Sequence, residues 1–108
     1  MSRILIPKKN TPDKDIVMTP EETAKDIIQH FSPKGTILDP CRGQGAFYNN
    51  YPTHCDKDYC EISEGKDFFD YNKKVDWIIT NPPWSKIKEF LKHSVKISDN
   101  IVYLISIN

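Results

Sequence analysis

The chain has 108 residues, which is enough for one domain but not for two. Hydrophobic residues make up 38% of it and charged residues 28%, so we expect a modest core and not a disordered chain. Lysine plus arginine number 15 and aspartate plus glutamate also number 15, so the net charge does not point to a nucleic-acid partner.

No apolar run approaches the roughly 20 residues of a membrane span, so no membrane association is expected. The first residues are broken too early by Pro7 to form a signal peptide. The three cysteines include no CxxC pair, which favours a reducing, cytoplasmic location. Cys55 and Cys60 lie near His54 but lack a fourth ligand and the usual spacing, so no metal site is expected.

Residues 1–17 show no lasting period and are expected to form an extended arm before a domain over 18–108. Thr19-Pro20-Glu21-Glu22 predicts the start of a helix, with Thr19 as N-cap, Pro20 at the first position and Glu22 closing a capping box. The helical spacing of its apolar residues predicts one buried stripe, formed by Ala24, Ile27, Ile28 and Phe31.

A short apolar strand from Thr36 delivers an acid, Asp39, into a loop that contains Gly43 and Gly45. A short helix over residues 45–49 is expected to follow. Such a strand, glycine loop and helix is typical of the nucleotide-binding corner of a doubly wound sheet. It is not a phosphate-binding P-loop, because no Gly-Lys-Ser/Thr follows, and the acid favours a ligand with a positive charge or hydrogen-bond donors. A plain β-turn is the alternative.

The next expected strand covers residues 58–62 and places Glu61 near its carboxyl end. In doubly wound folds an acid at that position binds ribose hydroxyls, although a surface carboxylate is the simpler interpretation. A third strand, residues 75–79, is followed at once by Asn81-Pro-Pro-Trp84. Proline cannot continue a ladder, so this is a stiff platform of a carboxamide, carbonyls and an aromatic ring, suited to a nucleobase. An ordinary proline turn is the alternative.

Ser85 is expected to cap a helix over residues 85–96 whose apolar side faces the core. Its other face is rich in lysine, and it either lies near a nucleic-acid backbone or is simply solvated. Residues 101–107 then predict a buried strand of a parallel sheet. The alternation of strands and helices predicts an α/β fold in which the strands that start near Thr36, Tyr59, Val75 and Ile101 are all parallel. The strand before the glycine loop and the strand before Asn81 are expected to be neighbours in this sheet.

Two of these motifs carry a resemblance to a family. Asp39-Pro-Cys-Arg-Gly-Gln-Gly45 resembles the S-adenosyl-L-methionine (AdoMet) loop of the amino-group DNA methyltransferases, and Asn81-Pro-Pro-Trp84 resembles their catalytic tetrapeptide. The order of motifs over residues 17–107 also fits the N6-adenine DNA methylases, including those of the phage type. The resemblance implies a three-layer α/β/α, Rossmann-like AdoMet-dependent methyltransferase fold. Pro40-Cys41 lies in the glycine loop, which disfavours a cytosine carbon-5 methylase.

The resemblance implies transfer of a methyl group from AdoMet to the exocyclic N6 of an adenine flipped from duplex DNA. In that reaction Asn81 and Pro82 would accept the two N6 hydrogens, and Pro83 and Trp84 would complete the platform, with Trp84 stacking on the base. The catalytic residues it implies are therefore Asn81, Pro82, Pro83 and Trp84.

The resemblance also assigns the cofactor-binding residues. Glu61 would hold the ribose hydroxyls of AdoMet, Asp67 would accept from its adenine amine, and Phe68 would pack near that ring. The residues expected around its methionine part are Thr19, Pro20, Asp39, Pro40, Gly43 and Gly45.

Two departures from the family pattern qualify the resemblance. Only five residues separate Glu61 from Asp67, too few for the helix and strand usual between those sites. The chain also stops at what would be the fifth strand, so we expect an N-terminal part of a methylase, completed by a missing region or by a partner chain. The alternatives are a non-catalytic AdoMet-binding remnant, and a methyltransferase that acts on RNA or on protein glutamine.

Overall fold

The computed structural model describes residues 19–105, which form a small α/β domain around a parallel sheet. Its elements are α1 (Glu21–Phe31), β1 (Thr36–Asp39), β2 (Asp56–Tyr59), β3 (Trp77–Thr80), α2 (Ile87–Ile97) and β4 (Asn100–Tyr103). The sheet order is β2-β1-β3-β4, and every pair of neighbours is parallel. The predicted parallel sheet, and the adjacency of the glycine-loop strand to the strand before Asn81, are therefore confirmed.

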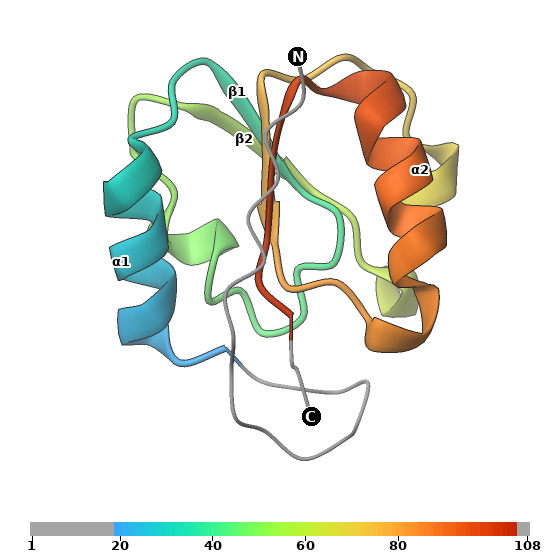
Figure 1. The fold of residues 1–108 in the computed structure, drawn as a ribbon, viewed down its shortest axis with the longest axis horizontal. Coiled ribbons are helices and arrows are strands. Elements are labelled where there is room, and N and C mark those ends of the chain that lie inside the picture. The colour runs from blue at the N-terminus through green and yellow to red at the C-terminus, as the bar shows by residue number, and fades with distance from the viewer. Residues whose placement is uncertain (1–18, 106–108) are drawn as a thin grey trace.

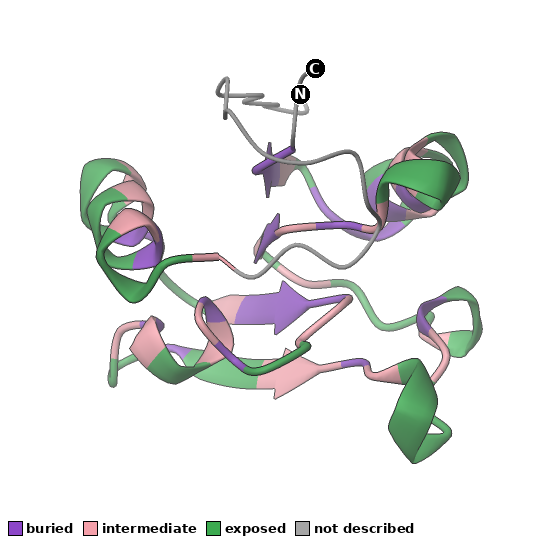
Figure 2. Ribbon diagram, turned by 90° about the horizontal axis from the view of Figure 1, so that it is seen from below, coloured by how far each residue is buried: buried purple, intermediate pink, exposed green. Residues whose placement is uncertain are grey.

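The two helices lie on opposite faces of the sheet, as Figure 1 shows. Alternate residues of each strand point to opposite faces, so Ile37 and Ile79 pack towards α1 while Leu38 and Ile78 pack towards α2. Both faces of the sheet are therefore buried along β1, β3 and β4, and exposed residues lie on the outer sides of the helices (Figure 2). This explains why β1, β3 and β4 are mainly apolar, whereas the edge strand β2 is polar and at most half-buried.

The predicted start of α1 was wrong in its details. The helix begins at Glu21 with Pro20 as its N-cap residue, and no side chain caps it. The Thr19 hydroxyl instead accepts a hydrogen bond from the Asn81 side chain, 3.0 Å away. A contact between distant parts of the chain has thus displaced the local capping box that the sequence favours. The helix ends at Phe31, and Ser32 after it adopts the left-handed conformation and donates its backbone N–H to the Ile28 carbonyl.

Four other predicted elements were shifted, and one of them is the third strand, which covers Trp77–Thr80 and not 75–79. The segment after the glycine loop is a 3-10 turn at Tyr48–Asn50 and not a helix over 45–49. The second strand ends at Tyr59, so Glu61 lies beyond it, and a tight turn follows in which Glu61 and Lys66 form a single antiparallel bridge. Ser85 lies inside a 3-10 turn, and α2 begins only at Ile87 without a side-chain cap. Such short turns satisfy backbone groups where too few residues are present for a regular helix.

Two predictions fall partly or wholly outside the described residues. They are the extended arm over 1–17 and the last two residues of the strand predicted over 101–107; in the described part that strand covers Asn100–Tyr103 and ends before residues 104 and 105, so it is shorter than predicted. Among residues 19–105, neither helix is long and apolar enough to span a membrane. In the same part of the chain, no cluster of three or more histidine, cysteine or acidic side chains could hold a metal ion.

Candidate cofactor and substrate site

The carboxyl ends of β1 and β3 are joined by a buried polar contact. Asp39 ends β1, and its Oδ1 accepts hydrogen bonds from the Thr80 hydroxyl at 2.5 Å and from the Cys41 backbone N–H at 3.1 Å. Only 1% of Asp39 is exposed. Burial raises the pKa of this carboxyl from 3.8 to about 6, although the hydrogen bonds and the nearby Arg42 guanidinium lower it in part. The acid of the predicted cofactor loop is thus fixed directly against the residue that precedes Asn81.

The loop after β1 needs its glycines for conformation. Gly43 and Gly45 both have positive φ, of 56° and 91°. A Cβ atom on Gly45 would lie 2.6 Å from the Asn49 side-chain nitrogen, whereas one on Gly43 would meet nothing within 4 Å. Both glycines are therefore required by backbone angle, and a side chain on Gly45 would in addition have to displace the Asn49 carboxamide, the movable end of a side chain.

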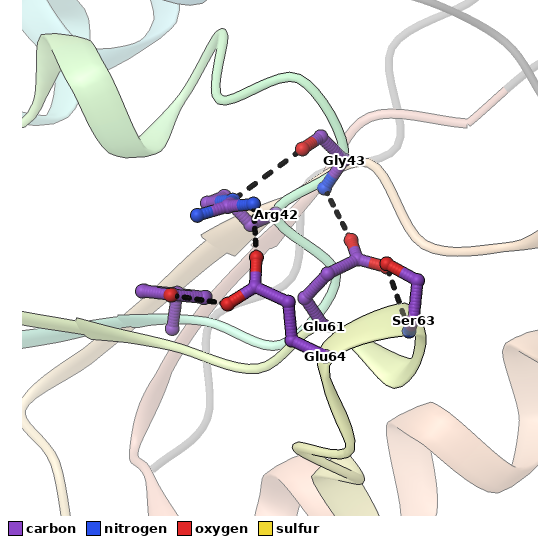
Figure 3. Close-up of polar contacts among 6 residues, drawn as sticks. Arg42, Gly43, Glu61, Ser63 and Glu64 are labelled. Carbon is purple, nitrogen blue, oxygen red and sulfur yellow. Dashed lines mark hydrogen bonds and ion pairs between the residues drawn. The ribbon is translucent and has the colours of Figure 1, made fainter.

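Glu61 ties this glycine loop to the end of β2. One of its carboxylate oxygens, Oε1, accepts from the Gly43 N–H at 2.9 Å, and the other, Oε2, accepts from the N–H and hydroxyl of Ser63 at 3.2 and 2.8 Å (Figure 3). Partial burial alone would raise the pKa of Glu61, but these hydrogen bonds and Arg42 outweigh burial and lower it. Three of the roughly four acceptor positions of a carboxylate are thus used, which leaves one on Oε1.

A second carboxylate holds the loop from outside. Arg42 forms an ion pair with Glu64 at 2.5 Å, and the Tyr59 hydroxyl donates to the same carboxylate at 2.7 Å. The Arg42 guanidinium also lies over the Tyr59 ring, 4.3 Å from its centroid. Figure 3 shows Arg42 and Gly43 reaching from the loop towards Glu64 and Glu61. The glycine loop is therefore anchored at two consecutive residues.

A hollow of about 260 Å³ opens beside this loop, between the ends of three strands and α2. Pro40 and Cys41 line it from the glycine loop, and Pro83 lines it from the segment after β3. Its remaining walls combine charged, polar, aliphatic and aromatic side chains: Glu61, Ile62, Lys66, Asp67, Phe68, Phe69, Ser85, Lys86 and Phe90. The mixture of apolar rings with a few polar groups is typical of a small-molecule site.

Aromatic packing shapes the floor of the hollow. Phe68 is 2% exposed, and its ring lies 5.0 Å from that of Phe90 and 4.7 Å from that of His93, centroid to centroid. Asp67 caps the short turn that carries Phe68, with its Oδ1 accepting from the Phe69 N–H at 2.9 Å. Its Oδ2 has no hydrogen-bond partner among the described residues, so it can accept from a ligand's amine.

The Asn-Pro-Pro-Trp segment leaves β3 at the same edge of the sheet. Donation from the Asn81 carboxamide nitrogen to Thr19 fixes the rotation of this side chain. Pro82 is buried, which makes the platform rigid, whereas Trp84 keeps 48% of its surface exposed. The exposed ring is available to stack on a flat group that approaches from solvent.

Five of the residues predicted from the sequence line the hollow: Pro40, Glu61, Asp67, Phe68 and Pro83. Three other predicted residues do not line the hollow. They lie in the adjoining glycine loop or at the strand end below it: Asp39, Gly43 and Gly45. Thr19 joins the site through Asn81 and not through the hollow, and Pro20 is exposed at the start of α1.

Sequence reasoning missed several wall residues. Ile62 is the clearest, since it is 71% exposed and stands next to Glu61 at the opening. An isoleucine inside an otherwise polar turn was the available signal, because a large apolar side chain in such a position often faces a ligand. Lys66, Phe69 and Phe90 had no comparable signal, because their place depends on how the turn folds back against α2.

No family model, curated protein or solved structure matches this chain.

Proposed function

We propose that this chain is an AdoMet-dependent methyltransferase of the Rossmann-like class, whose target is the exocyclic N6 of adenine in DNA. One observation carries the proposal: the Asp39–Thr80 hydrogen bond holds the end of the glycine-loop strand against the residue before Asn81. A cofactor bound at the glycine loop and a base held at Asn81-Pro-Pro-Trp84 would therefore meet at one edge of the sheet.

The residues present suit AdoMet in most respects. The hollow combines a broad apolar wall with an acid, Asp67, that has an acceptor oxygen left over for an adenine amine. Asp39 and Glu61 provide negative charge near the glycine loop, which favours a cationic ligand over a phosphate. Glu61 fits less completely, because it can accept one ribose hydroxyl on Oε1 but needs to release Gly43 or Ser63 to accept a second.

AdoMet, when bound, supplies an electrophilic methyl group on a sulfonium sulfur. The chain's own contribution is alignment and charge stabilisation, and no covalent nucleophile is needed. The oxygen of Asn81 and the carbonyl of Pro82 would accept the two N6 hydrogens and favour the positive charge that develops on the nitrogen. Trp84 would stack on the flipped base, which its 48% exposure permits.

The thiols near the site do not suggest a different chemistry. Burial, together with the nearby Asp39 and Glu61 charges, raises the pKa of Cys41 to about 12. A thiol of that pKa is almost wholly protonated at neutral pH and is a poor nucleophile. A cytosine carbon-5 mechanism through this cysteine is accordingly disfavoured on physical grounds.

The experiment has two parts. Calorimetry with AdoMet tests the cofactor site, and transfer of a labelled methyl group to adenine-containing DNA tests the reaction. Label that appears in RNA or on protein glutamine instead would keep the enzyme class and change the substrate. AdoMet binding without any transfer would indicate a binding remnant or one chain of a two-chain enzyme. No AdoMet binding at all would refute the proposal.

A further inference from the structure

The balanced net charge of the chain conceals two oppositely charged regions. Residues 39–70, which supply the glycine loop and most of the hollow, contain seven acidic and three basic side chains, a formal net charge of −4. Residues 71–99, which include β3 and α2, contain six lysines and three acidic side chains, a formal net charge of +3. The acidic region suits a cationic cofactor, and the basic region suits a polyanion.

Three lysines form a stripe on the outer face of α2. Lys88, Lys92 and Lys96 are spaced by four residues, so they follow one side of the helix, and all three are exposed. At 1.5 Å per residue the stripe is about 12 Å long. Lys86 extends it to the rim of the hollow. The buried residues of the helix, Phe90, Ser94 and Ile97, face the opposite way, towards the sheet.

The lysines of this stripe form no ion pairs with carboxylates of the described residues. The ion pair found among residues 19–105 joins Arg42 to Glu64, so none of the four ammonium groups has a carboxylate within 4 Å. Glu89 lies on the same helix yet forms no ion pair with them. Val95, which flanks the stripe, is 45% exposed, so no described element covers this face.

The stripe begins where the substrate platform ends. Asn81-Pro-Pro leads through the Trp84–Lys86 turn directly into α2, so Lys86 and Lys88 lie within a few residues of the exposed tryptophan. A nucleic-acid strand with a base at Trp84 would bring its neighbouring phosphates towards these lysines. Along a B-form duplex each strand has one phosphate per about 3.4 Å of axis, so 12 Å spans about three.

We infer that the outer face of α2 binds the phosphate backbone of DNA, through Lys86, Lys88, Lys92 and Lys96, without reading its sequence. The inference rests on the proposed function, since it supplies that site with a surface for its substrate. A membrane surface fits the stripe less well, because a helix bound to lipid needs an outward apolar face, and the apolar side of α2 is buried.

The test compares two double variants that change the net charge equally. K88Q/K92Q removes the centre of the stripe, and K25Q/K34Q removes two exposed lysines on and beside α1, across the sheet. Binding to a short fluorescent duplex is followed by anisotropy between 50 and 200 mM salt. Four phosphate contacts predict a slope of log K against log salt near −3.6 for the wild type, and the loss of two contacts makes it shallower by about 1.8.

If the proteins bind equally at 1 M salt, that change in slope weakens K88Q/K92Q about 200-fold at 50 mM and about 20-fold at 200 mM. The loss is expected to be the same for duplexes of different sequence, because phosphates carry no sequence information. K25Q/K34Q is expected to bind as the wild type does. Thermal melting of all three proteins shows that the fold is kept.

Several results would overturn the inference. They are an unchanged slope in K88Q/K92Q, an equal loss in K25Q/K34Q, or no DNA binding by the wild type even at low salt. Binding to phosphatidylserine vesicles but not to DNA, with the same dependence on the lysines, would identify a lipid partner instead. Calorimetry with AdoMet on the same samples keeps the two proposals apart. The lysine variants should bind AdoMet as the wild type does, and a wild type that binds DNA but not AdoMet would refute only the proposed function.

Discussion

Replacing Asp39 by asparagine tests two roles of its carboxylate, one in the pH dependence of the domain's stability and one in cofactor binding. The carboxyl is buried at the end of β1 and accepts from Thr80 and Cys41. Asparagine keeps the shape and an acceptor oxygen but carries no charge at any pH. We expect Asp39→Asn to lose a pH dependence of stability that the wild type shows, and to bind AdoMet more weakly because the negative charge is gone.

The size of the effect follows from the pKa of Asp39. It rises from 3.8 to about 6 on folding, mainly because burial removes the carboxylate from water. Well below pH 3.8 the carboxyl is protonated in both states and makes no difference. As the pH rises the unfolded chain ionises first, so stability is lost progressively up to about pH 6 and then levels off. Roughly two pKa units at 1.36 kcal/mol each correspond to about 3 kcal/mol.

Urea unfolding at several pH values between 4 and 8 measures this difference. Relative to the wild type, Asp39→Asn should gain about 2 kcal/mol between pH 4 and pH 7, because part of the full change of about 3 kcal/mol falls below pH 4. The buried amide N–H groups of asparagine add a cost of about 1–3 kcal/mol that is the same at every pH, so the change with pH is the readout and not the offset. Asp70→Asn, an exposed site, is the control. A constant difference between Asp39→Asn and the wild type at all pH values would refute the reasoning.

Three further predictions concern the site. Glu61→Ala should weaken AdoMet binding by ~1–3 kcal/mol, the range for a hydrogen bond to a charged group, and calorimetry would count against the assignment if affinity were unchanged. Asn81→Ala should lower the rate of methyl transfer to adenine-containing DNA by ~10²–10³-fold while AdoMet affinity stays constant, and Asn81→Asp should keep part of the activity. If activity were lost only in proportion to the fraction of unfolded protein, Asn81 would instead be a turn residue. Gly45→Ala should destabilise the domain by more than the ~1–2 kcal/mol expected for Gly43→Ala, because the φ of Gly45, 91°, lies farther from the left-handed minimum at about 57° and the Asn49 side chain must also move aside. Equal unfolding free energies for the two glycine variants would contradict the crowding at Asn49.

The arrangement of the strands could be predicted because it depends on local patterns. Short apolar runs separated by helical segments predict parallel strands, and the carboxyl ends of neighbouring parallel strands lie at one edge. That was enough to predict that Asp39 and Asn81 come from adjacent strands. It was not enough to predict that Thr80 joins them, since a threonine at the end of a strand has many possible partners.

The failures have a common cause in contacts between distant residues. Thr19 has every local feature of a helix cap, yet its hydroxyl contacts Asn81, more than sixty positions away. Gly43 donates to Glu61 from eighteen positions away, which changes the carboxylate from a simple ligand candidate into an anchor of the glycine loop. Neither contact leaves a periodic signal in the sequence, so neither could be found by pattern alone.

The positions of the two tryptophans allow folding and ligand binding to be followed separately by intrinsic fluorescence. Trp77 is partly buried and packs against the core beside Phe31, with ring centroids 6.1 Å apart, while Trp84 lies half exposed at the edge of the site. The chain contains no other tryptophan, so its indole emission comes from these two rings. Unfolding should shift the emission of Trp77 to longer wavelength, and a base stacked on Trp84 should quench the other component without altering the first. In Trp84→Phe the emission comes from the core alone, so a quench by added nucleic acid that disappears in this variant identifies the ring that the ligand touches.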